Sequence, residues 1–268
     1  MSAPAYRPPY VPATVLITGA TGGFGTAFAE RFAALGSRLV LTGRDVGKLD
    51  ALAHRLRDEF QVDTQRLCFD VRDRKAVEAG FQSLTGPFAD IDLLINNAGL
   101  AIGQDPAQAS DISDWEVMID TNDKALAVIT GLLLPRMVAR GSGHVVNISS
   151  TAGSYPYPGG HVYCASKAFV TQFSLALRAD LIGTGVRVTS VEPGMVAETD
   201  FSVVRFKGDK ERAAKVYANT TPLTGADVAE AVVWCATLPP HFNVNRVEIM
   251  PTTQGPGALA VHRRPAAE

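Results

Sequence analysis

The chain has 268 residues, of which 25 are Lys or Arg and 27 are Asp or Glu, so its formal net charge is −2. This near balance excludes a polycation that binds nucleic acid by neutralising phosphates. With 46 % hydrophobic and 19 % charged residues, the composition is globular and excludes intrinsic disorder for most of the chain.

Short apolar runs alternate along the chain with longer segments whose apolar residues recur three or four positions apart. The runs predict buried strands at 14–17, 38–42, 66–69, 92–95, 144–148, 186–191 and 247–250. The segments between them predict helices at 24–35, 45–60, 73–84, 114–140, 163–182 and 226–238. Because each parallel crossover needs about a dozen residues or more, the alternation predicts one α/β domain: a doubly wound, parallel sheet of seven strands with helices on both faces.

Three stretches depart from this alternation. The proline-rich start, 1–12, has no apolar core of a secretion signal or membrane anchor and predicts a disordered arm. Residues 195–224 lack a strong apolar period, which predicts a functional lid within a domain that spans 13–254. Residues 255–268 are irregular and predict a C-terminal tail.

The few cysteines and histidines bear on the compartment and on metal binding. Cys68, Cys164 and Cys235 are too scattered for a disulfide framework or a metal cluster. The five histidines have no paired spacing, so we expect no metal site. The longest apolar stretch is far shorter than the roughly 20 residues that span a bilayer. We therefore expect a cytoplasmic protein with neither a membrane nor a nucleic acid as partner.

A glycine-rich loop joins the first predicted strand to the first predicted helix. A dinucleotide pyrophosphate docks here in a doubly wound fold, because glycines let the backbone approach the phosphates and the helix N-terminus presents free N–H groups. A plain tight turn is the alternative, but the strand before and the helix after favour a cofactor. The candidate cofactor-binding residues of this loop are Gly19, Thr21, Gly22, Gly23, Phe24 and Gly25.

The tip of the second predicted strand distinguishes NAD from NADP. A carboxylate at this tip binds the ribose 2′-hydroxyl of NAD. Gly43 stands there instead, and the guanidinium fork of the next residue, Arg44, can bind a 2′-phosphate, so the sequence favours NADP. If the strand ended two residues later, Asp45 would be the acid that binds NAD. In a third interpretation Asp45 is the N-cap of the next helix.

The third and fourth predicted strands end in further candidate cofactor residues. Asp70 and Val71 follow the third strand, and Asn97, Ala98 and Gly99 follow the fourth. Each pair or triplet alone is better explained as a turn. Because the carboxyl ends of parallel strands meet at one edge, we expect these residues together to line the binding crevice.

Tyr163 and Lys167 are four residues apart at the start of a predicted helix. Residues i and i+4 share one helix face, so the Lys167 ammonium can lie near the Tyr163 phenol. Moving the phenol pKa from about 10 to about 7 takes roughly 4 kcal/mol, and a cation about 5 Å away at an effective dielectric of about 20 supplies about 3 kcal/mol. The cationic oxidised nicotinamide can supply the remainder. Tyr163 is thus a candidate general acid or base; for an isolated pair, a solvated helix face would be the better interpretation.

Two further polar residues complete this constellation. Ser150 follows a predicted strand thirteen residues before Tyr163 and can hold the substrate oxygen. Asn122, in the long helical segment, can anchor a water that relays protons by way of Lys167.

Taken in order and spacing, these motifs resemble the short-chain dehydrogenase/reductase family over nearly the whole chain. The motifs are Thr-Gly-x-x-x-Gly-x-Gly, Asn-Asn-Ala-Gly, Asn122, Ser150, Tyr163-x-x-x-Lys167 and Pro193-Gly194. The resemblance implies a Rossmann-like sheet of seven strands and a catalytic tetrad of Asn122, Ser150, Tyr163 and Lys167. It also implies a homotetramer built through the long helices and a cofactor held in addition by Tyr163, Lys167, Pro193, Gly194, Val196 and Thr199.

A narrower resemblance concerns the substrate. The segments 151–156, 192–194, 201–209 and 250–254 are similar to NADP-dependent 3-hydroxy acid dehydrogenases that oxidise serine and allo-threonine, and to sulfoacetaldehyde reductases. The chain departs from that group at Asp45, where a second basic residue is usual, and at Ala125, where glycine is usual. These enzymes handle small anions, and Arg205 in the lid is our candidate for the substrate carboxylate or sulfonate; a solvated loop cation is the alternative.

We therefore predict an NADP-dependent oxidoreductase that interconverts a small 3-hydroxy acid, of the serine, allo-threonine or 3-hydroxypropionate type, and its 3-oxo acid. Ser150 and Arg205 bind the substrate, and Tyr163 takes the hydroxyl proton as the cofactor takes the hydride. One alternative is a reductase of a small aldehyde or ketone such as sulfoacetaldehyde. An alternative of another class is a regulator that binds NADP without turnover.

Overall fold

Seven parallel strands form one sheet in the computed structural model, which describes residues 8–257. The strand order is β3-β2-β1-β4-β5-β6-β7. The bounds are β1 Thr14–Ile17, β2 Arg38–Gly43, β3 Thr64–Cys68, β4 Leu93–Asn96, β5 Gly143–Ile148, β6 Val186–Pro193 and β7 Arg246–Ile249. All seven predicted strands are confirmed. The order reverses between β1 and β4, which is the switch point at which ligands bind in open α/β sheets.

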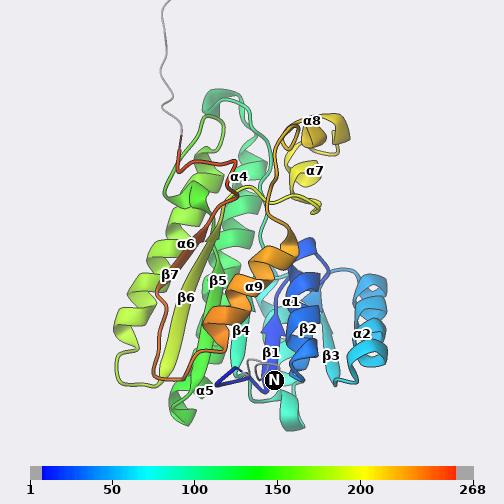
Figure 1. Ribbon diagram of the computed structural model, residues 1–268, viewed down its shortest axis with the longest axis vertical. Helices are drawn as coiled ribbons and strands as arrows, with labels where there is room; N and C mark the ends of the chain where they lie inside the picture. Colours follow the sequence, from blue (N-terminus) through cyan, green and yellow to red (C-terminus); the bar gives the residue numbers. More distant parts are fainter. Residues whose placement is uncertain (1–7, 258–268) are drawn as a thin grey trace, which may run out of the picture.

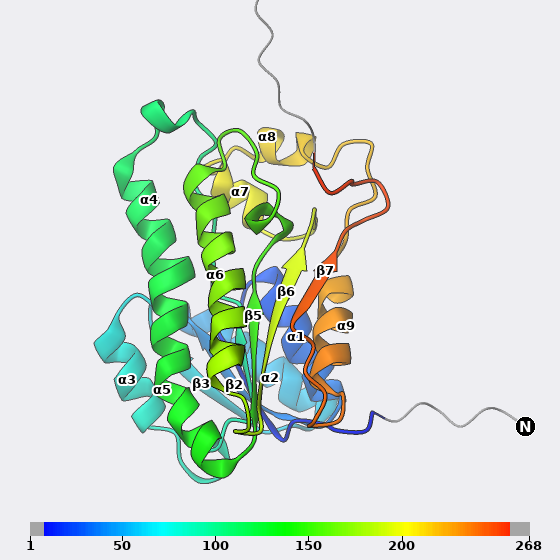
Figure 2. The same cartoon turned by 90° about the vertical axis from the view of Figure 1, so that its left-hand side faces the viewer.

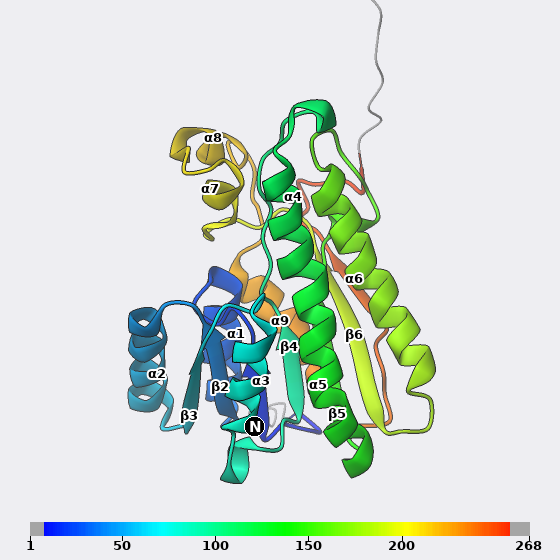
Figure 3. The ribbon, with the colours of Figure 1, turned by 180° about the vertical axis from the view of Figure 1, so that it is seen from behind.

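Helices cover both faces of the sheet. On one face lie α1 (Gly23–Ala34), α2 (Val46–Phe60) and α9 (Gly225–Ala236) (Figure 1). On the other face lie α3 (Arg74–Gln82), α5 (Ala125–Arg140) and α6 (His161–Asp180), and α4 (Ile112–Ile119) continues the line of α5 (Figure 3). Within residues 8–257, no helix is both long and apolar enough to cross a membrane.

Alternate residues of the strands build two separate hydrophobic cores. Val15 and Ile17 of β1 pack with Phe28 and Phe32 of α1 on one face. Leu16, between them, belongs to the core on the opposite face. This alternation follows from the strand period of two, and each side chain so buried contributes roughly 1.5–3 kcal/mol. Strands buried on both faces therefore read as continuous apolar runs in the sequence.

The structure corrects the prediction of one long helix at 114–140. The helix begins earlier, at Ile112, and a π-helical turn at Asp120–Lys124 separates α4 from α5. A π-turn widens the helix by one residue per turn and is often found at functional sites. Thr121 and Asn122 are buried within it. The apolar period alone does not reveal the turn, because helices on either side keep the same spacing.

Residues 195–224, which the sequence predicts to be a lid and which are called the lid segment below, lie beyond the carboxyl ends of the strands. It contains two short helices, α7 (Phe201–Arg205) and α8 (Lys210–Lys215), where the sequence shows no strong period. Figure 2 shows both helices at the end toward which β6 and β7 point. A parallel bridge between Val196 and Leu223 joins the two ends of the segment. The lid segment is thus a closed loop anchored beside β6.

The ends of the chain lie partly outside the described residues. Of the predicted arm, residues 8–12 pack on the domain: the Tyr10 N–H donates to the Thr237 carbonyl at 3.3 Å, and the Pro12 carbonyl accepts from the Ser37 hydroxyl at 2.7 Å. Residues 1–7 of the arm, and 258–268 of the predicted tail, lie outside the described part.

Candidate active site

A cavity of about 920 Å3 opens at the carboxyl ends of the strands. It is lined by residues that follow each of the seven strands, including the segment 195–224 after β6. The sequence-predicted residues that line it are Gly19, Thr21, Gly22, Gly23, Phe24, Arg44, Asp70, Val71, Asn97, Ala98, Gly99, Ser150, Tyr163, Lys167, Pro193, Gly194, Val196, Thr199 and Arg205. Two predicted residues, Gly25 and Asn122, lie behind the cavity wall. The loops that the sequence singled out therefore border one shared cavity.

The glycine loop brings the start of α1 against the end of β1. Gly25 is buried, and a Cβ at this position would lie 2.3 Å from the Gly19 carbonyl oxygen, so only glycine permits the approach. The N-cap of α1 is Gly22, which makes no side-chain hydrogen bond. The first N–H groups of α1 and the positive end of its dipole therefore face the cavity. This cradle fits a pyrophosphate group.

The tip of β2 presents two cations and turns its carboxylate away. Asp45 is the N-cap of α2, where its Oδ1 accepts the Lys48 N–H at 3.0 Å, and it does not line the cavity. Arg44 and Lys48 both line it. Lys48 was missed in the sequence, although its place in the first turn of the helix after Arg44 could have indicated it. This corner fits a phosphate better than a ribose hydroxyl that needs a carboxylate.

The loops after β1 and β4 are bonded to each other. The Thr18 hydroxyl accepts the N–H groups of Asn97 and Ala98, both at 2.9 Å. The Asn97 side-chain amide donates in return to the carbonyls of Thr18 and Gly19 at 2.9 and 3.1 Å. Thr18 was not predicted as a site residue. These bonds hold the floor of the cavity at the switch point of the sheet.

Tyr163 and Lys167 lie on the same side of α6 and face the cavity, as their spacing predicts. Their side chains are buried, and the Lys167 ammonium lies 5.8 Å from the centroid of the Tyr163 ring. Lys167 Nζ donates to the Ile148 carbonyl at 2.9 Å. Burial lowers the pKa of Lys167 to about 8, although the Asp123 carboxylate acts in the opposite direction. At neutral pH the lysine is still largely protonated.

Ser150 and Asn122 approach the same pair from two other elements. The Ser150 hydroxyl, at the end of β5, accepts the Ala152 N–H at 3.1 Å and lines the cavity. Asn122, in the π-turn, is fixed by Leu100: its Oδ1 accepts the Leu100 N–H and its Nδ2 donates to the Leu100 carbonyl, both at 2.9 Å. The four predicted catalytic residues therefore converge, with Asn122 one layer behind.

Gly99 separates Asn122 from Lys167. A Cβ at Gly99 would lie 3.3 Å from Asn122 Oδ1 and 3.4 Å from Lys167 Nζ. Because glycine has no side chain, a space is left between the amide oxygen and the ammonium. One lone pair of Asn122 Oδ1 is used by Leu100, and its second lone pair can accept a hydrogen bond from a water in that space.

Arg205 of α7 lies directly over the catalytic tyrosine candidate. Its guanidinium carbon is 5.3 Å from the Tyr163 ring centroid and 4.7 Å from that of Phe201. It also donates to the Tyr157 hydroxyl at 2.9 Å, a partner that was not predicted. The alternative of a solvated loop cation is therefore wrong for Arg205. Phe206, the next residue along the chain, packs under Arg212, whose guanidinium carbon is 4.4 Å from the ring centroid.

The pKa of Tyr163 differs from the prediction in both direction and cause, because it is raised above its usual value and not lowered toward 7. Burial raises the pKa of the phenol, and the charge that opposes this rise most strongly is that of Arg205, followed by the Ser150 hydroxyl. We expected Lys167 to provide that charge. The difference has a geometric reason, because the Lys167 ammonium is directed to the Ile148 carbonyl while the guanidinium lies over the phenol ring.

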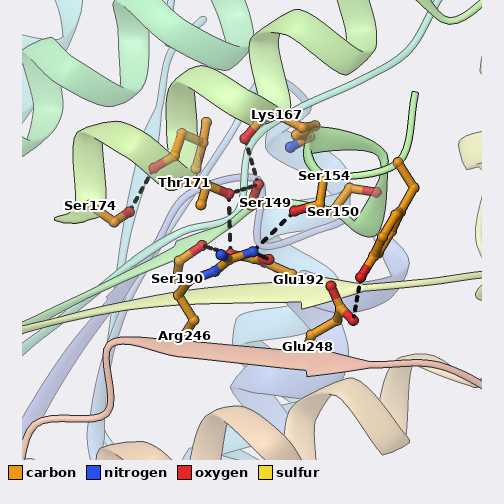
Figure 4. Close-up of polar contacts among 12 residues, drawn as sticks. Ser149, Ser150, Ser154, Lys167, Thr171, Ser174, Ser190, Glu192, Arg246 and Glu248 are labelled. Atoms are coloured by element: carbon orange, nitrogen blue, oxygen red, sulfur yellow. Dashed lines mark hydrogen bonds and ion pairs between the residues drawn. The ribbon is translucent and has the colours of Figure 1, made fainter. Parts of the chain in front are cut away.

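The buried carboxylate of Glu192 forms hydrogen bonds with several elements behind the site (Figure 4). Glu192 of β6 is fully buried, and its Oε1 accepts from Arg246 Nε, the Ser190 hydroxyl and the Thr171 hydroxyl at 2.9, 2.9 and 3.2 Å. The Thr171 hydroxyl oxygen lies 2.9 Å from that of Ser149, and the Ser149 hydroxyl donates to the Lys167 carbonyl at 2.7 Å. The chain of bonds therefore connects β5, β6 and β7 with the helix that carries Tyr163.

Comparison with known proteins gives a consistent result. The model of the short chain dehydrogenase family matches residues 13–210. The NADP-dependent 3-hydroxy acid dehydrogenase YdfG of Salmonella typhi is 55 % identical over 249 residues, covering 93 % of this chain and 99 % of that protein. Sulfoacetaldehyde reductase 2 of Chromohalobacter salexigens is 53 % identical over 250 residues, covering 93 % and 98 %. The closed form of serine dehydrogenase complexed with NADP+ superposes with a TM-score of 0.88 at 52 % identity, covering 94 % of this chain and 100 % of that one.

The Glu192 network yields a stability prediction. Arg246→Met should lower the free energy of unfolding by roughly 3 kcal/mol, because it leaves the buried Glu192 carboxylate without its counter-ion. Urea denaturation followed by circular dichroism measures the change. The double variant Glu192→Gln/Arg246→Met should recover part of the loss, since the unpaired charge is gone. If the loss in the double variant equalled the sum of the losses in Arg246→Met alone and Glu192→Gln alone, the coupling between the two residues would be contradicted.

Proposed function

This chain belongs to the short-chain dehydrogenase family, and from that premise we propose that it is an NADP-dependent oxidoreductase that interconverts small 3-hydroxy acids and their 3-oxo acids. The observation that carries the proposal is the guanidinium of Arg205, which lies beside the Tyr163 phenol in the cavity. It puts a fixed positive charge where the acid group of a short substrate would lie when the hydroxyl meets the phenol.

We assign the cofactor site to the part of the cavity under α1 and α2. The free N–H groups of α1 would hold the pyrophosphate, and Arg44 with Lys48 the 2′-phosphate. Pro193, Gly194, Val196 and Thr199 would hold the nicotinamide end. When bound, NADP supplies or accepts the hydride. The NADP-dependent relatives and the serine dehydrogenase with bound NADP+ support this choice.

The proton would be handled by the tetrad. In oxidation, Tyr163 takes the proton of the substrate hydroxyl as phenolate; in reduction it returns the proton as phenol. Ser150 would hold the substrate oxygen against Tyr163. Lys167 would pass the proton on through a water in the space beside Gly99, where Asn122 Oδ1 anchors that water.

The substrate class follows from the charges of the cavity. Among the described residues that line the cavity, two have carboxylates: Asp70, which follows β3, and Asp200, in the lid segment. The cations Arg205 and Lys167 lie beside Tyr163. A planar guanidinium binds a carboxylate through two parallel hydrogen bonds. We therefore assign serine, allo-threonine and 3-hydroxypropionate as the substrates to test first. The names of the relatives, 3-hydroxy acid dehydrogenase and serine dehydrogenase, support this assignment.

A second candidate is the reduction of sulfoacetaldehyde or a similar small aldehyde or ketone. The sulfoacetaldehyde reductase relative favours it, and a guanidinium binds a sulfonate as it binds a carboxylate. A regulator that binds NADP without turnover is disfavoured, because the tetrad converges around the cavity.

We retain the predicted homotetramer and the cytoplasmic location as proposals. Exposed apolar side chains on the long helices, Val138 of α5 and Phe169 of α6, support an interface of copies through these helices. Sedimentation of the full-length protein tests the number of copies.

The anion pocket can be tested by removing the guanidinium. Arg205→Ala should raise KM for serine or 3-hydroxypropionate by about 10- to 100-fold, the loss of a charge-assisted hydrogen bond, and KM for a neutral alcohol by less than about threefold. Initial rates of cofactor reduction measure both. Arg212→Ala is the matched control, because Arg212 lies over an aromatic ring of the lid segment but does not line the cavity. An equal rise in KM for acids and alcohols would refute the assignment.

The cofactor preference can be tested at the β2 tip. Arg44→Ala should lower kcat/KM for NADP by at least about tenfold and change kcat/KM for NAD by less than about twofold, because only NADP carries the 2′-phosphate. Asp45→Ala distinguishes the alternative. If it lowers kcat/KM for NAD while Arg44→Ala leaves NADP unaffected, Asp45 binds the ribose and the assignment fails.

The relay can be tested by filling the space beside Gly99. Gly99→Ala should lower kcat by about tenfold, because a methyl group would take the place of the water between Asn122 Oδ1 and Lys167 Nζ. Steady-state rates at saturating substrate measure kcat. Gly47→Ala is the control, since its Cβ would meet only Asp45 Oδ1, at 3.4 Å. An unchanged kcat in a folded Gly99→Ala protein would rule out a relay through this space.

A further inference from the structure

Tyr163 is enclosed by groups from four elements, and among the described residues 8–257 only two of the side chains that face it are cations. From its own helix come Lys167 and Cys164, from α7 Arg205, and from the loop before α6 Tyr157. From the end of β5 comes the neutral Ser150 hydroxyl. None of these groups is a carboxylate. The ionisation of the phenol therefore depends on the two cations and on burial.

The two cations differ in how they respond to pH. Lys167 is buried, and its pKa is lowered to about 8. Its ammonium therefore loses charge at a lower pH than the range in which the Tyr163 phenol ionises, because burial raises the pKa of that phenol above its usual value. A guanidinium stays protonated throughout this range. Arg205 is thus the lasting positive charge beside Tyr163.

The position of Arg205 is held by contacts that do not involve a substrate. Its guanidinium donates to the Tyr157 hydroxyl at 2.9 Å and lies over the rings of Phe201 and Tyr163, at 4.7 and 5.3 Å from their centroids. The arginine is therefore preorganised in the chain itself. A charge fixed at this distance in a water-poor site acts on the phenol whether or not an anion is bound.

We propose that Arg205 has a second role, which rests on the assignment of Tyr163 as the proton acceptor: its permanent charge stabilises the phenolate of Tyr163 and so makes this residue a usable base. The same guanidinium then serves substrate binding and proton transfer. In oxidation the phenolate oxygen gains the hydroxyl proton while the hydride leaves the substrate carbon for the bound NADP+, so charge and electrons balance. Burial raises the pKa of Tyr163 and the charge of Arg205 is the strongest influence that lowers it, in agreement with this role.

The sign of the effect separates this role from simple packing. Loss of the Arg205 charge removes the main stabilisation of the phenolate, so the pKa of Tyr163 should rise. Loss of lid packing would instead let water reach the phenol, and relief from burial would lower that pKa. The two explanations therefore predict shifts in opposite directions.

The test is a spectroscopic pH titration of the full-length protein saturated with NADP+, without substrate. The phenolate absorbance of each protein minus that of the same protein with Tyr163→Phe isolates Tyr163 among the 6 tyrosines. Arg205→Met, which keeps bulk but removes the charge, should raise the pKa of Tyr163 by about 1 to 2 units. Arg205→Lys, which keeps a cation, should shift it by less than about 0.5 unit. Arg212→Met, the matched control in the lid segment, should leave it unchanged.

A kinetic arm uses a neutral secondary alcohol, which does not need the guanidinium for binding. The acidic limb of its kcat/KM profile reports the base in the enzyme before the alcohol binds. In Arg205→Met this limb should move to higher pH by the same amount as the titration. Arg205→Lys should keep the limb in place while KM for 3-hydroxypropionate rises.

The outcomes decide separately on the two proposals. An unchanged or lowered pKa of Tyr163 in Arg205→Met, or an equal rise in Arg205→Lys, would overturn the second role. Because the titration contains no substrate, it gives the same answer even if hydroxy acids prove not to be substrates. Failure of the substrate assignment would show instead as the absence of any KM difference between acids and neutral alcohols.

Discussion

The constraint on which the site depends is the burial of one phenol. Only 8 % of Tyr163 is exposed, and withdrawal from water disfavours its charged form. A proton acceptor in such a place needs fixed positive charge or hydrogen-bond donors to offset that cost. Lys167, Arg205 and the Ser150 hydroxyl come from α6, from the lid segment and from the end of β5. The fold must therefore place three parts of the chain that are distant in sequence around the Tyr163 phenol, with little freedom in their positions.

Hydrogen bonds beneath the cavity, together with the two hydrophobic cores, hold these parts of the chain in place. Glu192 takes bonds from β6, β7 and α6, and the Ser149 hydroxyl ties α6 to the end of β5 at the Lys167 carbonyl (Figure 4). On the other side, the π-turn lets Asn122 bond the backbone of Leu100 after β4. A buried network of this kind is costly when incomplete, so it favours one arrangement of helix and strands.

How much of this could be predicted from the sequence depends on the range of the interaction. The strands, the glycine loop and the i, i+4 relation of Tyr163 and Lys167 are local patterns, and they were predicted correctly. The π-turn and the bond between Arg205 and Tyr157 depend on contacts across 22 and 48 positions of the chain, which no local pattern contains. For the same reason the sequence pointed to Lys167 as the cation acting on the phenol. Helical spacing shows that two residues share a face, but not where each side chain finds its hydrogen-bond partner.

The two roles proposed for Arg205 would link the charge of the substrate to the strength of the base. When a carboxylate pairs with Arg205, it offsets part of the positive charge that acts on Tyr163. The phenol then binds its proton more tightly than it does with the cavity free of anions. Before an acid substrate binds, the charge of Arg205 stabilises the phenolate. After the acid binds, the phenolate is a stronger base, because part of that charge is paired. A neutral alcohol leaves the charge of Arg205 unpaired. If the proposed substrates and proton acceptor are correct, selection for small acids would involve proton transfer as well as binding.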